Sequence, residues 1–140
     1  TRRLAREIAH LRKLGRLEMT GDLRVLIERI YQWRPQRGRI HPAAKAFQAL
    51  RIEVNQELEG LGAFIEGTVR LAAKGTRFVI ISFHSLEDRV VKRAFHALAC
   101  PEDGAPLLRA LTKKPVMASD AEVARNSRAR SAKLRAAERI

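Results

Sequence analysis

The apolar positions at the start of the chain recur at the three- and four-residue spacing of amphipathic helices. From Leu4 to Leu14 they are interspersed with arginines, which predicts a basic helix that Gly15 is placed to end. A second apolar stripe, from Leu23 to Tyr31, predicts another short helix. Two helices are therefore expected to open the chain.

The segment 31–42, YQWRPQRGRIHP, interrupts this pattern. It holds two prolines, one glycine, three arginines and the only Trp and Tyr of the chain, so an irregular basic loop is expected. Arginines pair with phosphates and an exposed aromatic ring stacks on bases, which favours contact with RNA. An alternative fits the sequence equally well, in which Tyr31 and Trp33 fill the gap between helices.

A third helical pattern begins at Ala43 and continues to Ala73, with a break expected near Gly60 or Gly62. Its apolar residues share one side of the helix. A polar stripe lies beside them, made of residues spaced three and four apart: Gln48, Arg51 and Asn55. A helix with one apolar and one polar stripe is therefore expected after the basic loop.

The stretch 77–83, RFVIISF, is almost continuously apolar, as in a strand that is covered on both faces. It predicts a central strand of a mostly parallel sheet, entered through a Lys-Gly-Thr turn. Ser85 and Asp88 have the spacing of a capping box, and the apolar residues from Val90 to Leu98 predict the buried face of a helix. Strand, turn and helix are therefore expected to meet within VIISFHSLEDR.

The last part of the chain is less regular. Residues 101–126 have weak periodicity and hold Pro101 and Pro115, which predicts a long surface excursion. The final RSAKLRAAERI, residues 130–140, predicts an edge strand. Helices combined with a sheet in this order indicate the α/β class.

Charge is distributed unevenly over the 140 residues, whose formal net charge is +13. Residues 1–51 hold 13 Lys and Arg against 4 Asp and Glu, residues 52–106 hold 6 against 8, and residues 107–140 hold 9 against 3. Two basic flanks around a nearly neutral centre favour a polyanionic partner, with nucleic acid as the first expectation. The alternative is the solvated surface of a charge-rich, heat-stable protein.

Composition also excludes several classes of protein. With 46% hydrophobic and 31% charged residues, the chain is globular and has room for about one domain. No apolar run reaches the ~18 residues that cross a membrane, and the N-terminus has no apolar signal core, so a cytoplasmic protein is expected. Cys100, the one cysteine, has no disulfide partner and no metal-ligand spacing around it, so no metal is expected.

Polar residues gather where the predicted strand ends: His84, Ser85, Glu87, Asp88 and Arg89. In an open α/β sheet, ligands bind beyond the carboxyl ends of the strands, and a helix N-terminus there adds free N–H groups. His84 is a candidate proton donor or acceptor, or else a structural histidine hydrogen-bonded at the strand end. For Ser85 a helix cap is favoured over a nucleophile, because no G-x-S-x-G elbow surrounds it, and Asp88 shares that capping role.

Three stretches resemble one protein family: HPAAKAFQALRIEVNQELEGL at 41–61, VIISFHSLEDRVVKRAF at 79–95 and NSRARSAKLRAAERI at 126–140. Together they resemble the MraW family, bacterial methyltransferases that modify N4 of a cytosine in small-subunit (16S) ribosomal RNA. The resemblance covers essentially the whole chain, in the family's order.

The resemblance implies a Rossmann-like, S-adenosylmethionine-dependent methyltransferase domain with an inserted helical lobe that helps to recognise RNA. Residues 1–42 would be the end of that lobe, and residues 43–140 the C-terminal part of the methyltransferase domain. The family's glycine-rich cofactor loop, acidic ribose-binding residue and D-x-G-x-S-S stretch have no match here. S-adenosylmethionine is therefore expected to bind residues upstream of Thr1.

By resemblance, the target base is expected near His84, Ser85 and Asp88. RNA contact or support of this pocket is expected from a second set: Arg34, Arg37, Arg39, His41, Gln48, Arg51, Asn55 and Arg89. The implied partner is 16S rRNA or the small ribosomal subunit, and no membrane is involved. The oligomeric state stays open, a homodimer included.

Two other functions compete with this one. A non-enzymatic RNA-binding module of basic helices would bind RNA in a salt-sensitive way, without methyl transfer. A hydrolase that used His84 and Ser85 would need a positioned acid partner and an oxyanion motif, and the sequence offers neither.

Overall fold

The computed structural model describes residues 2–36 and 39–140, so Arg37 of the expected RNA-contact set lies outside the described residues. The chain forms two compact units, Thr1–Gln56 and Glu57–Ile140. They divide after the third helix, because that helix packs with the two before it. The assignment of the two parts to an inserted lobe and an enzyme domain stays a prediction.

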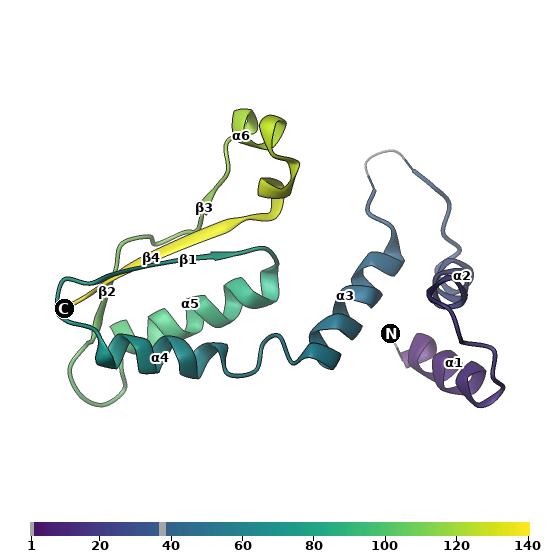
Figure 1. Cartoon of the computed structure of the whole chain (residues 1–140), viewed down its shortest axis with the longest axis horizontal. Coiled ribbons are helices and arrows are strands. Elements are labelled where there is room, and N and C mark those ends of the chain that lie inside the picture. Colours follow the sequence, from purple (N-terminus) through teal and green to yellow (C-terminus); the bar gives the residue numbers. More distant parts are fainter. Residues whose placement is uncertain (1, 37–38) are drawn as a thin grey trace. The chain divides into compact units, whose positions relative to one another are not determined.

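Three helices form the first unit: α1 (Arg2–Lys13), α2 (Thr20–Ile30) and α3 (Pro42–Asn55) (Figure 1). The helices predicted from the apolar stripes are confirmed, and Gly15 follows α1 with a φ of 64°, which glycine adopts without strain. Their apolar stripes converge on one cluster of buried side chains: Leu23, Leu26, Ile27 and Ala43. Leu4 and Ile8 of α1 pack against this cluster, which is how a short basic helix is held in place.

The second unit combines helices with a small sheet. Its elements are α4 (Leu61–Leu71), β1 (Arg77–Ser82), α5 (Ser85–Ala99), β2 (Leu108–Ala110), β3 (Val116–Met117), α6 (Asp120–Arg125), the 3-10 helix η1 (Ser127–Ser131) and β4 (Lys133–Arg139). The expected break before α4 is confirmed, since Gln56 and Gly60 both have positive φ, 52° and 73°. The turn before β1 is confirmed as well, because the Thr76 N–H donates to the Ala73 carbonyl at 3.2 Å and Gly75 has a φ of 85°.

The strand order β1-β4-β2 corrects two predictions. Every described strand pair is antiparallel, with Phe78 opposite Ala137 and Arg109 opposite Glu138. Within the described residues β1 pairs with β4 alone, so it is an edge strand and not the central strand of a parallel sheet. The predicted edge strand β4 is the central one. Because β1 and β2 both run antiparallel to β4, they are parallel to each other.

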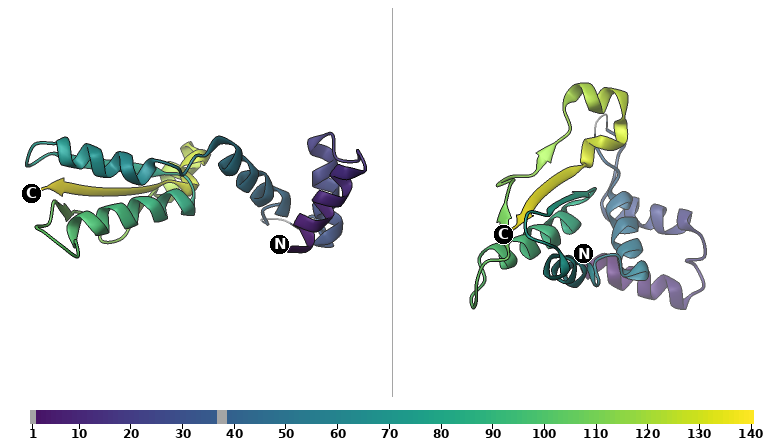
Figure 2. Two further views of the ribbon diagram at one scale, coloured as in Figure 1. Left: turned by 90° about the horizontal axis from the view of Figure 1, so that it is seen from below. Right: turned by 60° about the vertical axis from the view of Figure 1, so that its left-hand side comes forward.

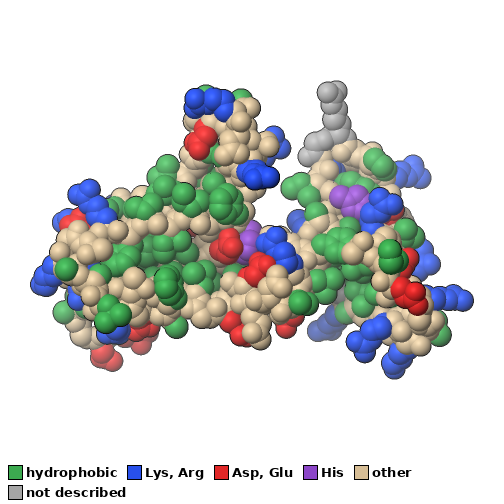
Figure 3. Space-filling view, viewed as in Figure 1, with side chains coloured by type: hydrophobic (Ala, Val, Ile, Leu, Met, Phe, Trp, Pro, Cys, Tyr) green, Lys and Arg blue, Asp and Glu red, His purple; other side chains and the backbone are tan. Residues whose placement is uncertain are grey.

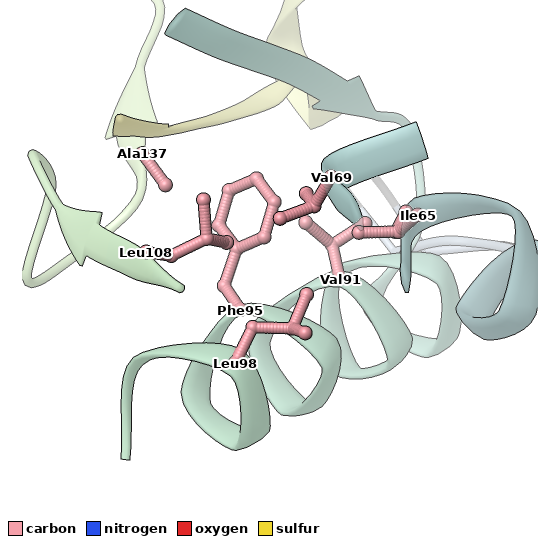
Figure 4. Close-up of a cluster of buried hydrophobic side chains, with 7 residues drawn as sticks. All are labelled: Ile65, Val69, Val91, Phe95, Leu98, Leu108 and Ala137. Atoms are coloured by element: carbon pink, nitrogen blue, oxygen red, sulfur yellow. The ribbon is translucent and has the colours of Figure 1, made fainter. Parts of the chain in front are cut away.

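One face of the sheet is covered by two helices. α4 and α5 lie side by side along this face (Figures 1 and 2), and Phe78 and Ile80 of β1 point into the core beneath it. The centre of the core is shown in Figure 4: Ile65, Val69, Val91, Phe95, Leu98, Leu108 and Ala137. The alternate residues of β1 face the other way, and Val79 and Ile81 are 59% and 53% exposed. The continuous apolar run therefore reflects one covered and one open face.

The predicted surface excursion at 101–126 is only partly correct. The segment is largely exposed, but Leu108 is 1% exposed and β2 extends the sheet on the far side of β4. Thr112 fixes the next turn, because its Oγ1 accepts a hydrogen bond from the Ala136 N–H at 2.9 Å. Strands of two and three residues have no measurable periodicity, so long-range pairing with β4 decides their structure.

Candidate functional site at the end of β1

The turn between β1 and α5 holds the predicted cluster. His84 has extended backbone angles, φ −140° and ψ 163°, and α5 begins at the next residue. Its Nδ1 accepts a hydrogen bond from the Glu87 N–H at 3.2 Å, and Glu87 Oε2 accepts from the N–H groups of Phe83 and His84 at 2.9 and 3.3 Å. His84 and Glu87 thus form the capping box. The prediction that Ser85 and Asp88 cap the helix is wrong by one residue, because Ser85 already lies in the first helical turn.

This cap fixes the tautomer of His84. Because Nδ1 accepts an N–H, the neutral ring carries its proton on Nε2. The His84 side chain is only 10% exposed, and within the described residues Nε2 has no hydrogen-bond partner. Glu87 Oε1 lies 3.2 Å from Nε2 but outside hydrogen-bond geometry. His84 can therefore donate from Nε2, whereas protonation at Nδ1 would break the helix cap.

Asp88 is committed to a buried ion pair with Arg135 of β4. Its Oδ1 accepts from Arg135 Nε at 2.6 Å and its Oδ2 from Arg135 Nη2 at 3.1 Å, with side chains 13% and 8% exposed. The Arg135 hydrogen bond lowers the pKa of Asp88, although burial opposes this shift. The pair joins the first turn of α5 to the central strand.

Sequence reasoning missed Arg135. The two-residue alternation of a strand could have indicated it, because Arg135 lies on the same buried face as Ala137. A charge on a buried face needs a partner. Identifying Asp88 as that partner requires the tertiary fold, since 47 residues separate the two.

Ser85 and Arg89 are exposed on the first turns of α5. Within the described part of the chain, neither side chain makes a hydrogen bond or an ion pair that would occupy it. Beside them, Ser82 ends β1 in a buried position and its Oγ donates to the Lys133 carbonyl at 3.4 Å. The strand end therefore offers a buried N–H donor, an exposed hydroxyl and an exposed guanidinium.

The first unit has its own candidate contact surface around His41. His41 caps α3 by accepting the Ala43 N–H at Nδ1, 3.1 Å away, and its Nε2 lies 3.0 Å from Glu28 Oε1. Trp33 meets the His41 ring edge-on, with centroids 5.3 Å apart. Trp33 and His41 line a hollow of about 370 Å³ that arginines also border: Arg24 and Arg39.

These contacts concern the two interpretations of the basic loop, which are RNA contact and filling of the gap between helices. Trp33 is partly buried against His41 and also lines the hollow, while Tyr31 is 50% exposed. Arg34 and Arg39 are exposed, as RNA contact would require. Glu28, the partner of His41, was not singled out by the sequence pattern, because it lies on the preceding helix.

The polar stripe of α3 belongs to the first unit. Arg51 and Asn55 are exposed and Gln48 is half-buried. The cluster at His84 belongs to the second unit, so the structure describes these two groups separately. Their joint action at one pocket stays a prediction.

The described part of the chain contains neither a cluster of metal-binding side chains nor a helix that could span a membrane. Among residues 2–36 and 39–140, no three His, Cys, Asp or Glu side chains gather where they could hold a metal ion. No helix in those same ranges is long and apolar enough to cross a bilayer.

An α/β unit with polar donors at a strand end is a class of fold used by many enzymes. Comparison with known proteins gives the family: the model of the MraW methylase family matches residues 1–140, so the chain belongs to that family. It is 45% identical to the "Ribosomal RNA small subunit methyltransferase H" of Nitratidesulfovibrio vulgaris (strain DP4), with 99% of this chain and 46% of that protein aligned.

Two further relatives bear the same name. The protein of Fusobacterium nucleatum subsp. nucleatum is 46% identical over 99% of this chain and 47% of its own length. The protein of Trichodesmium erythraeum is 49% identical over 100% of this chain and 46% of its own length. The chain thus spans about half the length of these relatives.

Proposed function

We propose that the whole protein containing this chain transfers a methyl group from S-adenosylmethionine to N4 of a cytosine in 16S rRNA. The observation that carries the proposal is the family match over residues 1–140, with relatives named as small-subunit rRNA methyltransferases. Those names favour an enzyme over a non-enzymatic RNA-binding module. The substrate would be free 16S rRNA or the small ribosomal subunit, and the protein would act in the cytoplasm as a monomer or a homodimer.

We assign the second unit to the C-terminal part of a Rossmann-like sheet. Two observations support this: β1 and β2 are parallel strands on either side of β4, and within the described residues one edge of β1 has no partner. The exposed Val79 and Ile81 would be covered if further strands and helices of the whole protein joined that edge. Residues 1–42 would close an inserted lobe, and residues 43–140 would belong to the methyltransferase domain.

S-adenosylmethionine would supply the methyl group from its sulfonium. The described side chains do not form a site suited to it, because no glycine-rich loop follows β1 and both oxygens of Asp88 are bound to Arg135. We therefore place the cofactor-binding residues in the part of the relatives that this chain does not span. This chain's contribution would be to hold the RNA and the target base.

For the base, we propose that His84 is a hydrogen-bond donor and not the proton acceptor. The N4 amine of cytosine is a poor nucleophile, because its lone pair is delocalised into the ring, so a site must fix its orientation. The Nε2–H of His84 is enclosed and has no hydrogen-bond partner within the described residues, so an acceptor on an unstacked base would satisfy it if the side chains around the ring move to admit the base. Ser85 and Arg89 would add contacts, while Asp88 would position α5 through Arg135.

For the rest of the RNA, we propose contacts from the first unit. Arg34, Arg39 and His41 would meet phosphates and bases around the hollow at Trp33. The stripe of α3 would continue that surface or support the base pocket: Gln48, Arg51 and Asn55. Arg37 belongs to the same proposed set.

The test of this function uses the whole protein. Incubation with S-adenosylmethionine and undermethylated small ribosomal subunits is expected to produce N4-methylcytidine, detected by mass spectrometry of the rRNA nucleosides. Omission of S-adenosylmethionine provides the control. Salt-sensitive binding of rRNA with no methylated nucleoside would instead identify a non-enzymatic RNA-binding module.

The location of the cofactor site gives a separate prediction. Calorimetric titration of the 140-residue chain with S-adenosylmethionine is expected to show no binding, whereas the whole protein binds it. Circular dichroism of the same sample establishes whether the chain is folded. Micromolar binding by the folded chain alone would show that the proposed placement of the cofactor site is wrong.

A further inference from the structure

Exposed cations gather where η1 leads into β4. Arg125 ends α6, Arg128 and Arg130 lie in η1, and all three side chains are exposed. Figure 3 shows Lys and Arg side chains over α6 and η1, at the top of the second unit. Within the described residues none of the three arginines is in an ion pair, and Asp120 and Glu122 are the only acidic residues from 113 to 133. We call these three arginines the η1 basic surface.

The backbone beneath this surface is held by hydrogen bonds and by one buried side chain. Asn126 Oδ1 accepts a hydrogen bond from the Arg128 N–H at 3.2 Å and thereby caps η1. Ala129, between the two exposed arginines of η1, is 6% exposed and anchors the helix. The Ala132 N–H then donates to the Ala129 carbonyl at 3.0 Å and directs the chain into β4.

The sheet register relates this surface to the candidate site. η1 ends at Ser131, and Lys133 of β4 pairs with Ser82, the last residue of β1. The His84 turn begins two residues beyond Ser82, so the η1 basic surface and the base-binding candidates leave the sheet at the same end. Lys133 and Lys92 also act on Asp88, whose pKa their charges lower. Lys133, two residues after η1, therefore adds positive charge between the η1 basic surface and the candidate site.

We propose that the η1 basic surface binds the phosphate backbone of the substrate RNA beside the target nucleotide. This inference rests on the proposed function and adds a phosphate contact to the second unit, beside its candidates for base contact. Unpaired exposed arginines with no acidic neighbour in contact suit a polyanion, and release of counterions from phosphates would drive the contact. Such contacts orient the RNA strand and carry no sequence preference.

The test replaces all three arginines in the whole protein with glutamine: Arg125→Gln, Arg128→Gln and Arg130→Gln. A matched triple variant removes the same charge at the opposite end of the sheet and from α4: Arg70→Gln, Arg77→Gln and Arg109→Gln. These control arginines are exposed but paired with Glu66 or Glu138. Binding to naked 16S rRNA and to small subunits is measured between 50 and 300 mM KCl, together with S-adenosylmethionine affinity.

The η1 variant is expected to reduce the slope of log K against log salt by about 2, since each lost phosphate contact is worth about 0.7. Its affinity for naked rRNA near 0.1 M salt should fall on the order of 10- to 100-fold, with S-adenosylmethionine affinity unchanged. The control variant should change the slope little. Equal effects of the two variants, or none from the η1 variant, would overturn the proposal.

Two other outcomes are distinguishable. Weaker binding to small subunits with unchanged binding to naked rRNA would assign the surface to a ribosomal protein and overturn the RNA contact. If the unmodified protein neither binds rRNA nor methylates it, the proposed function itself fails. If the unmodified protein methylates rRNA and the η1 variant binds rRNA as tightly as the unmodified protein does, the proposed function stands and only the role of the η1 basic surface is rejected.

Discussion

Asp88→Asn is expected to destabilise the second unit by about 3–5 kcal/mol, because it leaves Arg135 charged, buried and without its carboxylate. The replacement keeps the shape of the side chain, so lost packing contributes little. The free energy of unfolding is measured by urea titration of the whole protein. Because a protein of several units is not strictly two-state, hydrogen exchange of β1 and β4 amides localises the effect.

The control is Asp103→Asn, which removes an exposed carboxylate that makes no ion pair within the described residues. A surface change of this kind should stay within about 0.5 kcal/mol. A double variant, Asp88→Leu with Arg135→Met, should recover much of the loss, since both charges leave the interior together. If Asp88→Asn costs no more than Asp103→Asn, the pair does not stabilise this unit.

The same pair makes stability depend on pH in a defined direction. The pKa of Asp88 is lower in the folded protein than its ordinary value of about 3.9 in the unfolded chain. Its contribution is therefore complete above the unfolded pKa and is lost as pH falls through the folded pKa. The stability difference between the unmodified protein and Asp88→Asn should be constant from pH 5 to 7 and should shrink below about pH 4.

Local patterns were sufficient for the elements but not for their pairing. The spans of α1, α5 and β1 follow from apolar spacing and turn residues that lie within a few positions of one another. The sheet depends on β4, whose residues pair with residues of β1 and β2 that lie 27 to 61 positions earlier in the chain. A nearly continuous apolar run such as residues 78–83 does not distinguish a strand covered on both faces from one covered on a single face. The edge position of β1 could therefore not be predicted from the sequence.

The candidate site shows the same division. Its position at the strand end followed from the change from apolar to polar residues at His84. The identity of the capping residues did not follow from the sequence. The pairs Ser85-Asp88 and His84-Glu87 have equal spacing, and only the backbone angles distinguish them. The role of Asp88 depends on a residue from another strand, and no pattern within α5 indicates Arg135.

The proposed role of His84 as a hydrogen-bond donor can be separated from its role as a helix cap. Asparagine is among the best N-cap residues, so His84→Asn should retain the hydrogen bond from Glu87 N–H and lose the imidazole ring with its Nε2–H donor. In the whole protein this variant is expected to lower the rate of methyl transfer about 100-fold, the effect of removing one oriented donor. Single-turnover transfer from radiolabelled S-adenosylmethionine to small subunits measures that rate.

Two controls decide between a donor and a structural histidine. His96→Asn changes an exposed histidine of the same helix and should leave transfer unchanged. His84→Ala removes both the cap and the donor. It should therefore lower the stability by about 1 kcal/mol and also lower the rate of methyl transfer. If His84→Asn transfers methyl groups within about threefold of the unmodified rate while His84→Ala is destabilised, His84 only caps α5. A rate that falls in His84→Asn without loss of thermal stability would instead support a role of the imidazole in the reaction, because the helix cap is retained.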